Sequence, residues 1–248
     1  GTIYTCRASL LIGTFNDDNT NTVTFTPIGE ATQLVFDAEP GSSTAGTPLS
    51  VQPVVKILVA NTNIVTAGPD ATALISLAVS ASSPSIGTVR GTVTLAAVGG
   101  VATFTGINLQ EAGIKILTAT KTDTSGQTYG SGVLTVDSDP FTISPGTVSP
   151  LMSTIIATPS GPLVANGTAS YNVAITLTDQ YSNAISGVKP QFTSTISADS
   201  VTQPAVNTNA AGTSSGSVAS TVAGSRILAI SSPAGLTSVA TSVSFVPG

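Results

Sequence analysis

The stretch Ser170-Tyr171-Asn172-Val173-Ala174-Ile175-Thr176-Leu177-Thr178 alternates large apolar side chains with mostly hydroxyl and amide side chains. In a β-strand, successive side chains point to opposite faces of the sheet. The pattern therefore predicts a strand with one face in a core and the other in water. We expect Ile175 to be buried and Thr176 to lie on the opposite face.

A similar alternation lies earlier in the chain, at Val51, Pro53, Val55, Ile57 and Val59. Because proline cannot donate a hydrogen bond to a neighbouring strand, Pro53 predicts an edge strand or a bulge at that point. Polar turns follow both stretches, at residues 60–63 and 179–183. Thr, Val and Ile are abundant, no stretch shows an amphipathic helical pattern, and the pattern as a whole favours an all-β fold.

The chain also repeats itself. Three passages begin with glycine and continue with alternating residues, and the glycines are 112 and 111 residues apart. A phenylalanine-containing passage that ends in proline or Pro-Gly follows each of them. This period suits one β-sandwich of about 100 residues per repeat. The glycine passages are Gly1–Cys6, Gly113–Thr118 and Gly224–Ala229, and the later passages are Phe25–Pro27, Phe141–Gly146 and Phe245–Gly248.

These repeats predict three units: residues 1–27, 28–146 and 147–248. The first unit is too short for a sandwich, because two strands alone are marginally stable in water. We expect it to be the last two strands of an Ig-like domain, completed either by an upstream part of the same polypeptide or by a second chain. Its apolar residues would then be covered by protein outside residues 28–248, and the initial Gly1 fits a section of a longer polypeptide.

Residues 32–146 resemble the Ig-like repeats of large secreted and cell-surface bacterial proteins. The resemblance rests on Leu34-Val35-Phe36, Thr44-Ala45-Gly46, residues 51–55, Gly100–Phe104 and Phe141–Gly146.

Residues 151–246 are more similar to the intimin/invasin-type Ig-like repeat. Here the matching residues are Ala165–Ala169, Ile175–Asp179, Asn183–Val188 and Thr208–Gly212. The resemblance implies tandem Ig-like β-sandwich domains at a bacterial surface, where such repeats serve as stalks, spacers, adhesive tips and filament subunits. One departure is that Val59-Ala60-Asn61 stands where an Asp usually precedes the turn.

Composition excludes several functions. Only 8% of the 248 residues are charged, the formal net charge is −5, and the chain has no histidine, no tryptophan and a single cysteine. Without histidine, the chain has no Ser-His-Asp triad, and with a single cysteine it has neither the usual ligands of a zinc site nor an internal disulfide. Seven scattered basic residues do not make a nucleic-acid surface. No apolar stretch approaches the roughly 20 residues of a membrane span.

Two passages match catalytic motifs by their letters. Gly212-Thr213-Ser214-Ser215-Gly216 has the nucleophile-elbow spacing, and Ser186-Gly187-Val188-Lys189 has the spacing of a serine–lysine pair. The elbow needs a histidine, and the pair needs a helix that Gly187 and Pro190 oppose. We therefore expect a turn leading into a strand over residues 217–222 for the first passage, and a strand or turn for the second.

Three further features have two interpretations each. The acidic pairs Asp17-Asp18 and Asp137-Ser138-Asp139 suit either a solvated turn or a calcium site, although they lack EF-hand spacing. Cys6 suits either a small buried side chain or a disulfide to a cysteine outside this chain. Asn166-Gly167-Thr168 is a glycosylation sequon by its letters, but we expect it to form the turn before the strand that begins near residue 169.

Together these observations predict a non-enzymatic structural segment of a bacterial extracellular surface protein or filament. We expect no catalytic, cofactor-binding or metal-ligating residues. The partners would be other copies of the chain or neighbouring Ig-like domains, because a surface poor in charge is easily desolvated on packing. The alternative is an adhesin module that binds a host or surface glycan or protein.

Overall fold

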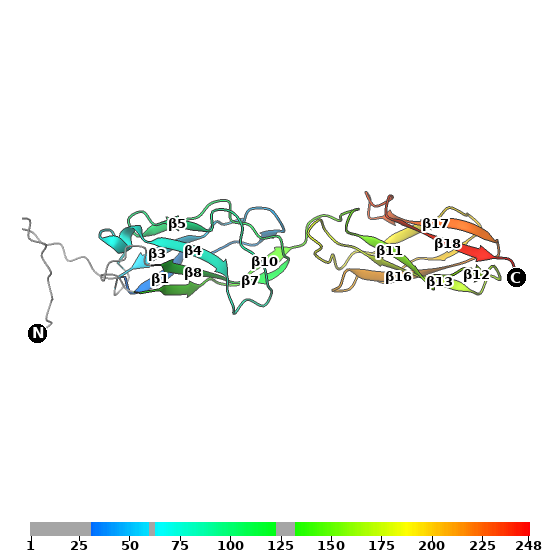
Figure 1. Cartoon of the computed structure of the whole chain (residues 1–248), viewed down its shortest axis with the longest axis horizontal. Coiled ribbons are helices and arrows are strands. Elements are labelled where there is room, and N and C mark those ends of the chain that lie inside the picture. Colours follow the sequence, from blue (N-terminus) through cyan, green and yellow to red (C-terminus); the bar gives the residue numbers. More distant parts are fainter. Residues whose placement is uncertain (1–30, 60–62, 123–131) are drawn as a thin grey trace, which may run out of the picture.

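The computed structural model describes residues 31–59, 63–122 and 132–248, which form two β-sandwiches arranged end to end (Figure 1). A single turn of 3₁₀ helix, η1 (Pro69–Thr72), interrupts the strands of the first sandwich. The expected all-β, Ig-like architecture is confirmed. None of the helical structure in these ranges is long and apolar enough to cross a membrane.

The first sandwich consists of three sheets, with strand orders β1-β3-β6, β5-β4-β8-β9 and β2-β10-β7. The third sheet lies at the end that faces the second sandwich (Figure 1). The strands are β1 (Gln33–Ala38), β2 (Ser43–Thr44), β3 (Val54–Leu58), β4 (Leu74–Val79), β5 (Thr94–Ala96), β6 (Val101–Thr103), β7 (Gly113–Lys115), β8 (Leu117–Thr122), β9 (Leu134–Asp137) and β10 (Phe141–Ser144).

The second sandwich consists of two four-stranded sheets, with strand orders β11-β13-β16-β15 and β12-β18-β17-β14. Its strands are β11 (Thr154–Thr158), β12 (Leu163–Val164), β13 (Ser170–Thr176), β14 (Gln191–Ser194), β15 (Ser200–Thr202), β16 (Thr213–Ala219), β17 (Gly224–Ser232) and β18 (Ala240–Val246).

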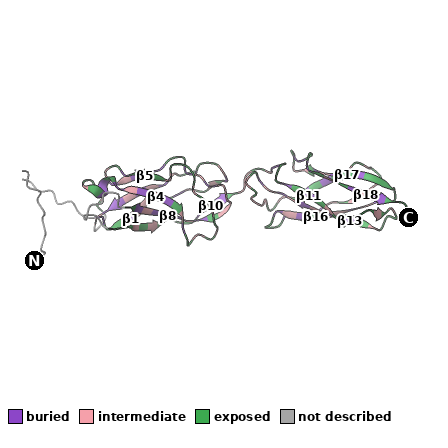
Figure 2. Cartoon of the chain, in the orientation of Figure 1, coloured by how far each residue is buried: buried purple, intermediate pink, exposed green. Residues whose placement is uncertain are grey.

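Each sandwich buries its own apolar core (Figure 2). The alternation predicted for β13 is confirmed, because Tyr171, Val173, Ile175 and Leu177 are all buried. Thr176, between two of them, is half-buried on the other face. The β13 strand pairs with β11 on one side and β16 on the other, so its register fixes one whole face of the core.

Of the two alternatives predicted at Pro53, the edge strand is wrong, whereas a bulge does lie beside it, because the β1–β3 register shifts between Phe36 and Ala38, opposite Val54. The β3 strand begins one residue later, at Val54, and it is the central strand of its sheet, paired with both β1 and β6. Pro53 lies just outside the regular ladder, where its carbonyl accepts a hydrogen bond from Phe104 N. A proline is tolerated there because it precedes the first residue that has to donate to the ladder.

For the Gly212–Gly216 passage, the expected turn leading into a strand is confirmed, but its predicted bounds are wrong. The turn lies earlier, at residues 209–212, and residues 213–216 already belong to β16, which ends at Ala219 rather than at residue 222. Gly216 is required inside this strand, since a Cβ there would meet the carbonyl oxygen of Thr202 and the ring of Phe192. Close approach of another backbone is a known reason for glycine within a strand.

Charged side chains lie inside both sandwiches. Lys121 Nζ is 2.6 Å from Asp70 Oδ1 in the first, and Arg226 Nε is 2.9 Å from Asp199 Oδ2 in the second. Lys115 is also fully buried. Three of the seven basic side chains are therefore withdrawn from the surface, which makes the exterior poorer in positive charge than the composition suggests.

The predictions for residues 1–27, including Cys6 and Asp17-Asp18, lie outside the described residues, as does most of the turn at residues 60–63.

Candidate functional site

The most elaborate polar arrangement in the described residues lies where the two sandwiches meet. Its centre is the turn at residues 179–183, which follows β13. Asp179 is fully buried, and its Oδ1 accepts hydrogen bonds from the backbone N–H groups of Tyr181 and Asn183, both at 2.9 Å. Ser182 completes the turn with a φ of 66°. The carboxylate thus shapes a tight loop that points toward the first sandwich.

The other oxygen of Asp179 holds the connection between the sandwiches. Its Oδ2 accepts hydrogen bonds from Gly146 N and from Asn183 Nδ2, each at 2.8 Å. Burial raises the pKa of Asp179, but the hydrogen bonds from Asn183, Gly146 and Tyr181 lower it, and the net result is a pKa below the ordinary value for an aspartate. The carboxylate is therefore the stable form at neutral pH.

Asn183 contacts the first sandwich directly. Its Nδ2 donates to the carbonyl of Gln110 at 2.7 Å, and its Oδ1 accepts from Ala112 N at 2.8 Å. A side-chain amide has a donor and an acceptor side by side, so it pairs with one exposed backbone segment at two points. This contact fixes both the position and the direction of the turn.

Tyr181 supplies the apolar part of the contact. Its half-buried ring packs against the core of the first sandwich and over the backbone of Gly46. Gly46 has a φ of 77°, and a Cβ at this position would collide with the tyrosine ring and hydroxyl. Glycine is thus required here twice, for its left-handed backbone and for the room it leaves.

We call this set of contacts the joint, defined by Asp179, Tyr181 and Asn183 on the second sandwich and by Gly46, Gln110, Ala112 and Gly146 on the first. The sequence predicted the turn itself but not its role. A tyrosine within an otherwise polar turn was the available indication, since an exposed aromatic ring commonly marks a contact surface.

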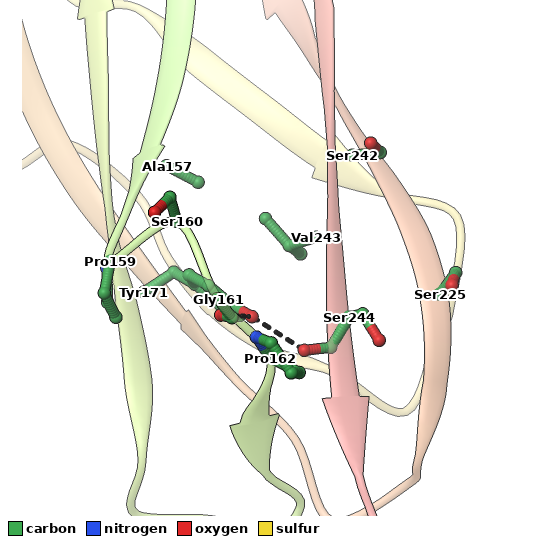
Figure 3. A pocket seen from close by; sticks show the side chains of 10 residues that line it. All are labelled: Ala157, Pro159, Ser160, Gly161, Pro162, Tyr171, Ser225, Ser242, Val243 and Ser244. Atoms are coloured by element: carbon green, nitrogen blue, oxygen red, sulfur yellow. Dashed lines mark hydrogen bonds between the residues drawn. The ribbon is translucent and has the colours of Figure 1, made fainter.

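A shallow pocket of about 200 Å³ lies in the second sandwich (Figure 3). The hydroxyl of Tyr171 is within hydrogen-bonding distance of the carbonyls of Gly161 and Ser244, and the ring meets Phe245 edge to face at 5.2 Å. The pocket offers hydroxyl and backbone groups, and its lining residues are Ala157, Pro159, Ser160, Gly161, Pro162, Tyr171, Ser225, Ser242, Val243 and Ser244.

The passages with catalytic spacing do not assemble a reactive site. Ser214 is a buried residue of β16 whose hydroxyl donates to the carbonyl of Val206 at 2.7 Å. Residues 186–189 form no helix, and Lys189 is exposed. The structure therefore brings neither serine to a base.

The carboxylate of Asp137 is occupied by hydroxyl groups. Thr118, Ser80 and Ser82 donate to it at 2.6, 2.9 and 2.8 Å, and these bonds, that from Thr118 most, hold its pKa below the usual range. Ser138 Oγ bonds to the backbone of Leu117 and Asp139. In the described ranges no three acidic or cysteine side chains gather around a common point.

The sequon forms a turn, as expected. Asn166 Oδ1 accepts hydrogen bonds from the backbone of Thr168 and Ala169 and from the Thr168 hydroxyl, at 2.8–3.0 Å. The side chain thus initiates the turn that leads into β13.

Comparisons with known proteins return structural similarity alone. No protein-family model matches the chain, and no curated protein matches it. Among solved structures, invasin, described as a bacterial integrin-binding protein, is 18% identical with a TM-score of 0.45, over 88% of this chain and 40% of invasin. InvD of Yersinia pseudotuberculosis is 20% identical with a TM-score of 0.47, over 87% and 58%. The Escherichia coli adhesin FdeC is 16% identical with a TM-score of 0.42, over 88% and 65%.

The chain thus spans about half the length of the first two structures that it matches. At 16–20% identity, these similarities concern the fold alone. The chain is an all-β protein with two Ig-like sandwiches in tandem.

Proposed function

We propose that this chain is a non-enzymatic, stiff spacer segment of a bacterial extracellular surface protein or filament. The observation that supports the proposal is the joint. Three hydrogen bonds, which involve Gln110 O, Ala112 N and Gly146 N, connect the sandwiches together with the packed ring of Tyr181. Two sandwiches that rotate freely about each other would need only a flexible linker. The domain division that we propose, residues 28–146 and 147–248, places the joint at the boundary.

The short connection supports the same proposal. Residues 145–150 contain two prolines, which restrict the backbone and favour an extended path. Gly146 lies between the two prolines and donates to Asp179. This hydrogen bond ties the connection to the second sandwich. A connection of this kind transmits orientation from one sandwich to the next.

The surface supports a structural role in an assembly. Only 8% of the residues are charged, and the three buried basic side chains are balanced by the buried carboxylates of Asp70, Asp179 and Asp199. Neighbouring molecules therefore present little charge to one another and lose little hydration energy on contact. Exposed hydroxyl side chains can form hydrogen bonds across wet contacts. Other copies of the chain or neighbouring Ig-like domains are therefore the partners that we propose.

The stiffness can be measured with two spin labels. Cysteines at the exposed positions Thr94 and Asn172, in a Cys6→Ser background, place one label on each sandwich. We expect a narrow distance distribution, which Tyr181→Asn broadens. Gln180→Ala, in the same turn but exposed, is the matched control and leaves the distribution unchanged. A distribution in the unmutated joint as broad as in Tyr181→Asn would overturn the proposal.

A further inference from the structure

The far end of the second sandwich repeats the geometry that the first sandwich presents to the joint. Gly46 and Gly167 have φ values of 77° and 79°, and their N–H groups donate to Leu109 O at 2.7 Å and Ser220 O at 3.0 Å. Each glycine follows a two-residue strand, β2 or β12, that pairs in parallel with the last strand of its sandwich. Gly167 therefore occupies the place of the glycine on which Tyr181 packs.

The loop that receives Asn183 also has a counterpart. Leu109 and Ser220 precede Gly113 and Gly224 by the same number of residues, and these two glycines pair with Ile143 and Phe245 of the final strands. Thr221 and Ala223 thus correspond to Gln110 and Ala112. The loop before Gly224 therefore has the carbonyl of Thr221 and the N–H group of Ala223 at the same sequence spacing as the two groups that Asn183 contacts.

A buried cation supports each loop. Lys115 lies two residues after Gly113, and Arg226 lies two residues after Gly224. Lys115 Nζ donates to the carbonyl of Ala112, and the Arg226 guanidinium donates to the carbonyls of Val222 and Gly224. The Arg226 guanidinium also lies 4.6 Å from the centre of the Phe245 ring. These contacts hold each loop in shape without a partner.

The part of the joint that contains Gly146, which donates to Asp179, also has a counterpart in the sequence. Pro145-Gly146 follows β10, and Pro247-Gly248 follows β18. Gly146 is half-buried and donates to Asp179. Gly167, Thr221 and Ala223 are exposed, although Gly46, Gln110 and Ala112 are half-buried in the joint.

We propose that the surface formed by Gly167, Thr221, Ala223 and Gly248 is the docking surface for one further β-sandwich, joined directly behind Gly248 in the same polypeptide. The recognised element is a turn of the type Asp-x-Tyr-x-Asn. Its carboxylate accepts from Gly248 N, its aromatic ring packs on Gly167, and its amide pairs with Thr221 O and Ala223 N. This inference deepens the proposed spacer function by naming the neighbour and its contacts.

Two observations favour this occupant over others. The Asp179 turn of a second molecule is already engaged in that molecule's own joint, so it is not free to dock. The corresponding turn of the first sandwich begins at Val59, whose N–H donates to Asn63 O as Asp179 N donates to Asn183 O. That turn has Val59 and Asn61 in place of the carboxylate and the ring, so it lacks two of the three recognition groups.

The test is a chain in which residues 147–248 are repeated behind Gly248, which recreates the sequence of the native connection. Spin labels at Asn172 and at the same residue of the appended copy report the new junction. We expect a distribution as narrow as at the native joint, and slower hydrogen exchange of the Ala223 and Gly248 amides than in the unextended chain. Asp179→Val with Tyr181→Asn, in the appended copy alone, should broaden the distribution and restore fast exchange.

The chain provides its own matched control. Residues 147–150 followed by residues 31–146, appended behind Gly248 instead of a second copy of 147–248, keep the connection but bring a sandwich with Val59 and Asn61 in place of the carboxylate and the ring, and we expect a broad distribution. A broad distribution with the appended second sandwich, beside a narrow one at the native joint, would overturn this inference and leave the spacer function standing. Broad distributions at both junctions would overturn the spacer function itself. Dimerisation of the unextended chain through Gly167 and Ala223 would contradict the assignment to the same polypeptide.

Discussion

The ring of Tyr181 lies on the backbone of Gly46, so close that a Cβ on residue 46 would force the ring to move. The two residues belong to different sandwiches. Their contact turns two independently built cores into one oriented pair, because each residue is held in place by its own sandwich. Gly46 N donates to Leu109 O, and Tyr181 N donates to Asp179.

Gly46→Ala should loosen the joint, because the new methyl group displaces the tyrosine ring. The left-handed backbone adds about 1 kcal/mol of strain in the first sandwich. Gly106→Ala is the control, since Gly106 has a φ of 70° and open space around the Cβ position. Both variants should lower the stability by a similar amount in urea titration. Only Gly46→Ala should broaden the Thr94–Asn172 distance distribution, and equal distributions would show that the ring contact does not orient the sandwiches.

Asp179 should make the joint sensitive to acid. Its pKa in the folded protein is lowered, so its stabilising effect is fully present above the unfolded-state pKa of about 3.9 and is lost as the pH falls through the folded-state value. Asp179→Asn should cost about 1–3 kcal/mol at neutral pH, because hydrogen-bond acceptors of a charged group are lost. Urea titrations from pH 6 to pH 2.5 should show the difference between the two proteins shrinking below about pH 4. A constant difference across this range would contradict the assignment.

Ile175→Ala should destabilise the second sandwich by about 2–5 kcal/mol, since Ile175 is fully buried in its core. Thr176→Ala, on the other face of β13, should cost about 0.5 kcal/mol or less. Chemical denaturation of each variant measures both values. A larger effect at Thr176 than at Ile175 would mean that the strand register is shifted by one residue.

Arg226→Met should cost about 3–5 kcal/mol, because it leaves the carboxylate of Asp199 buried without its cation. The side chains of both residues are completely shielded from solvent, so water cannot compensate. The double variant Asp199→Leu/Arg226→Met removes both charges and should be more stable than Arg226→Met alone. Denaturant midpoints of the four proteins of the cycle give the coupling, and additive effects would show that the pair does not interact.

The alternation of residues 170–178 predicted β13, its buried face and the position of Ile175, because side-chain periodicity in a strand is a local property. The two passages that begin at Gly113 and Gly224 marked equivalent places in the two sandwiches, because an alternating pattern that starts at a glycine is also a local property. Local patterns failed where another backbone decided the outcome. Gly216 reads as a turn residue in the sequence, yet it lies inside β16 because Thr202 and Phe192 leave no room for a Cβ.

The sequence by itself determined β13, the all-β class and the period of the repeat, since these follow from residue periodicity and backbone preference. The tertiary structure alone decided that Asp179, Tyr181 and Asn183 face Gly146, Gly46 and Gln110. These residues are distant in sequence, and three of the contacts on the first sandwich are made by backbone groups, which every residue possesses. A contact to a backbone N–H or carbonyl does not require a particular residue type. It therefore cannot be predicted from the sequence and is recognised only in the folded structure.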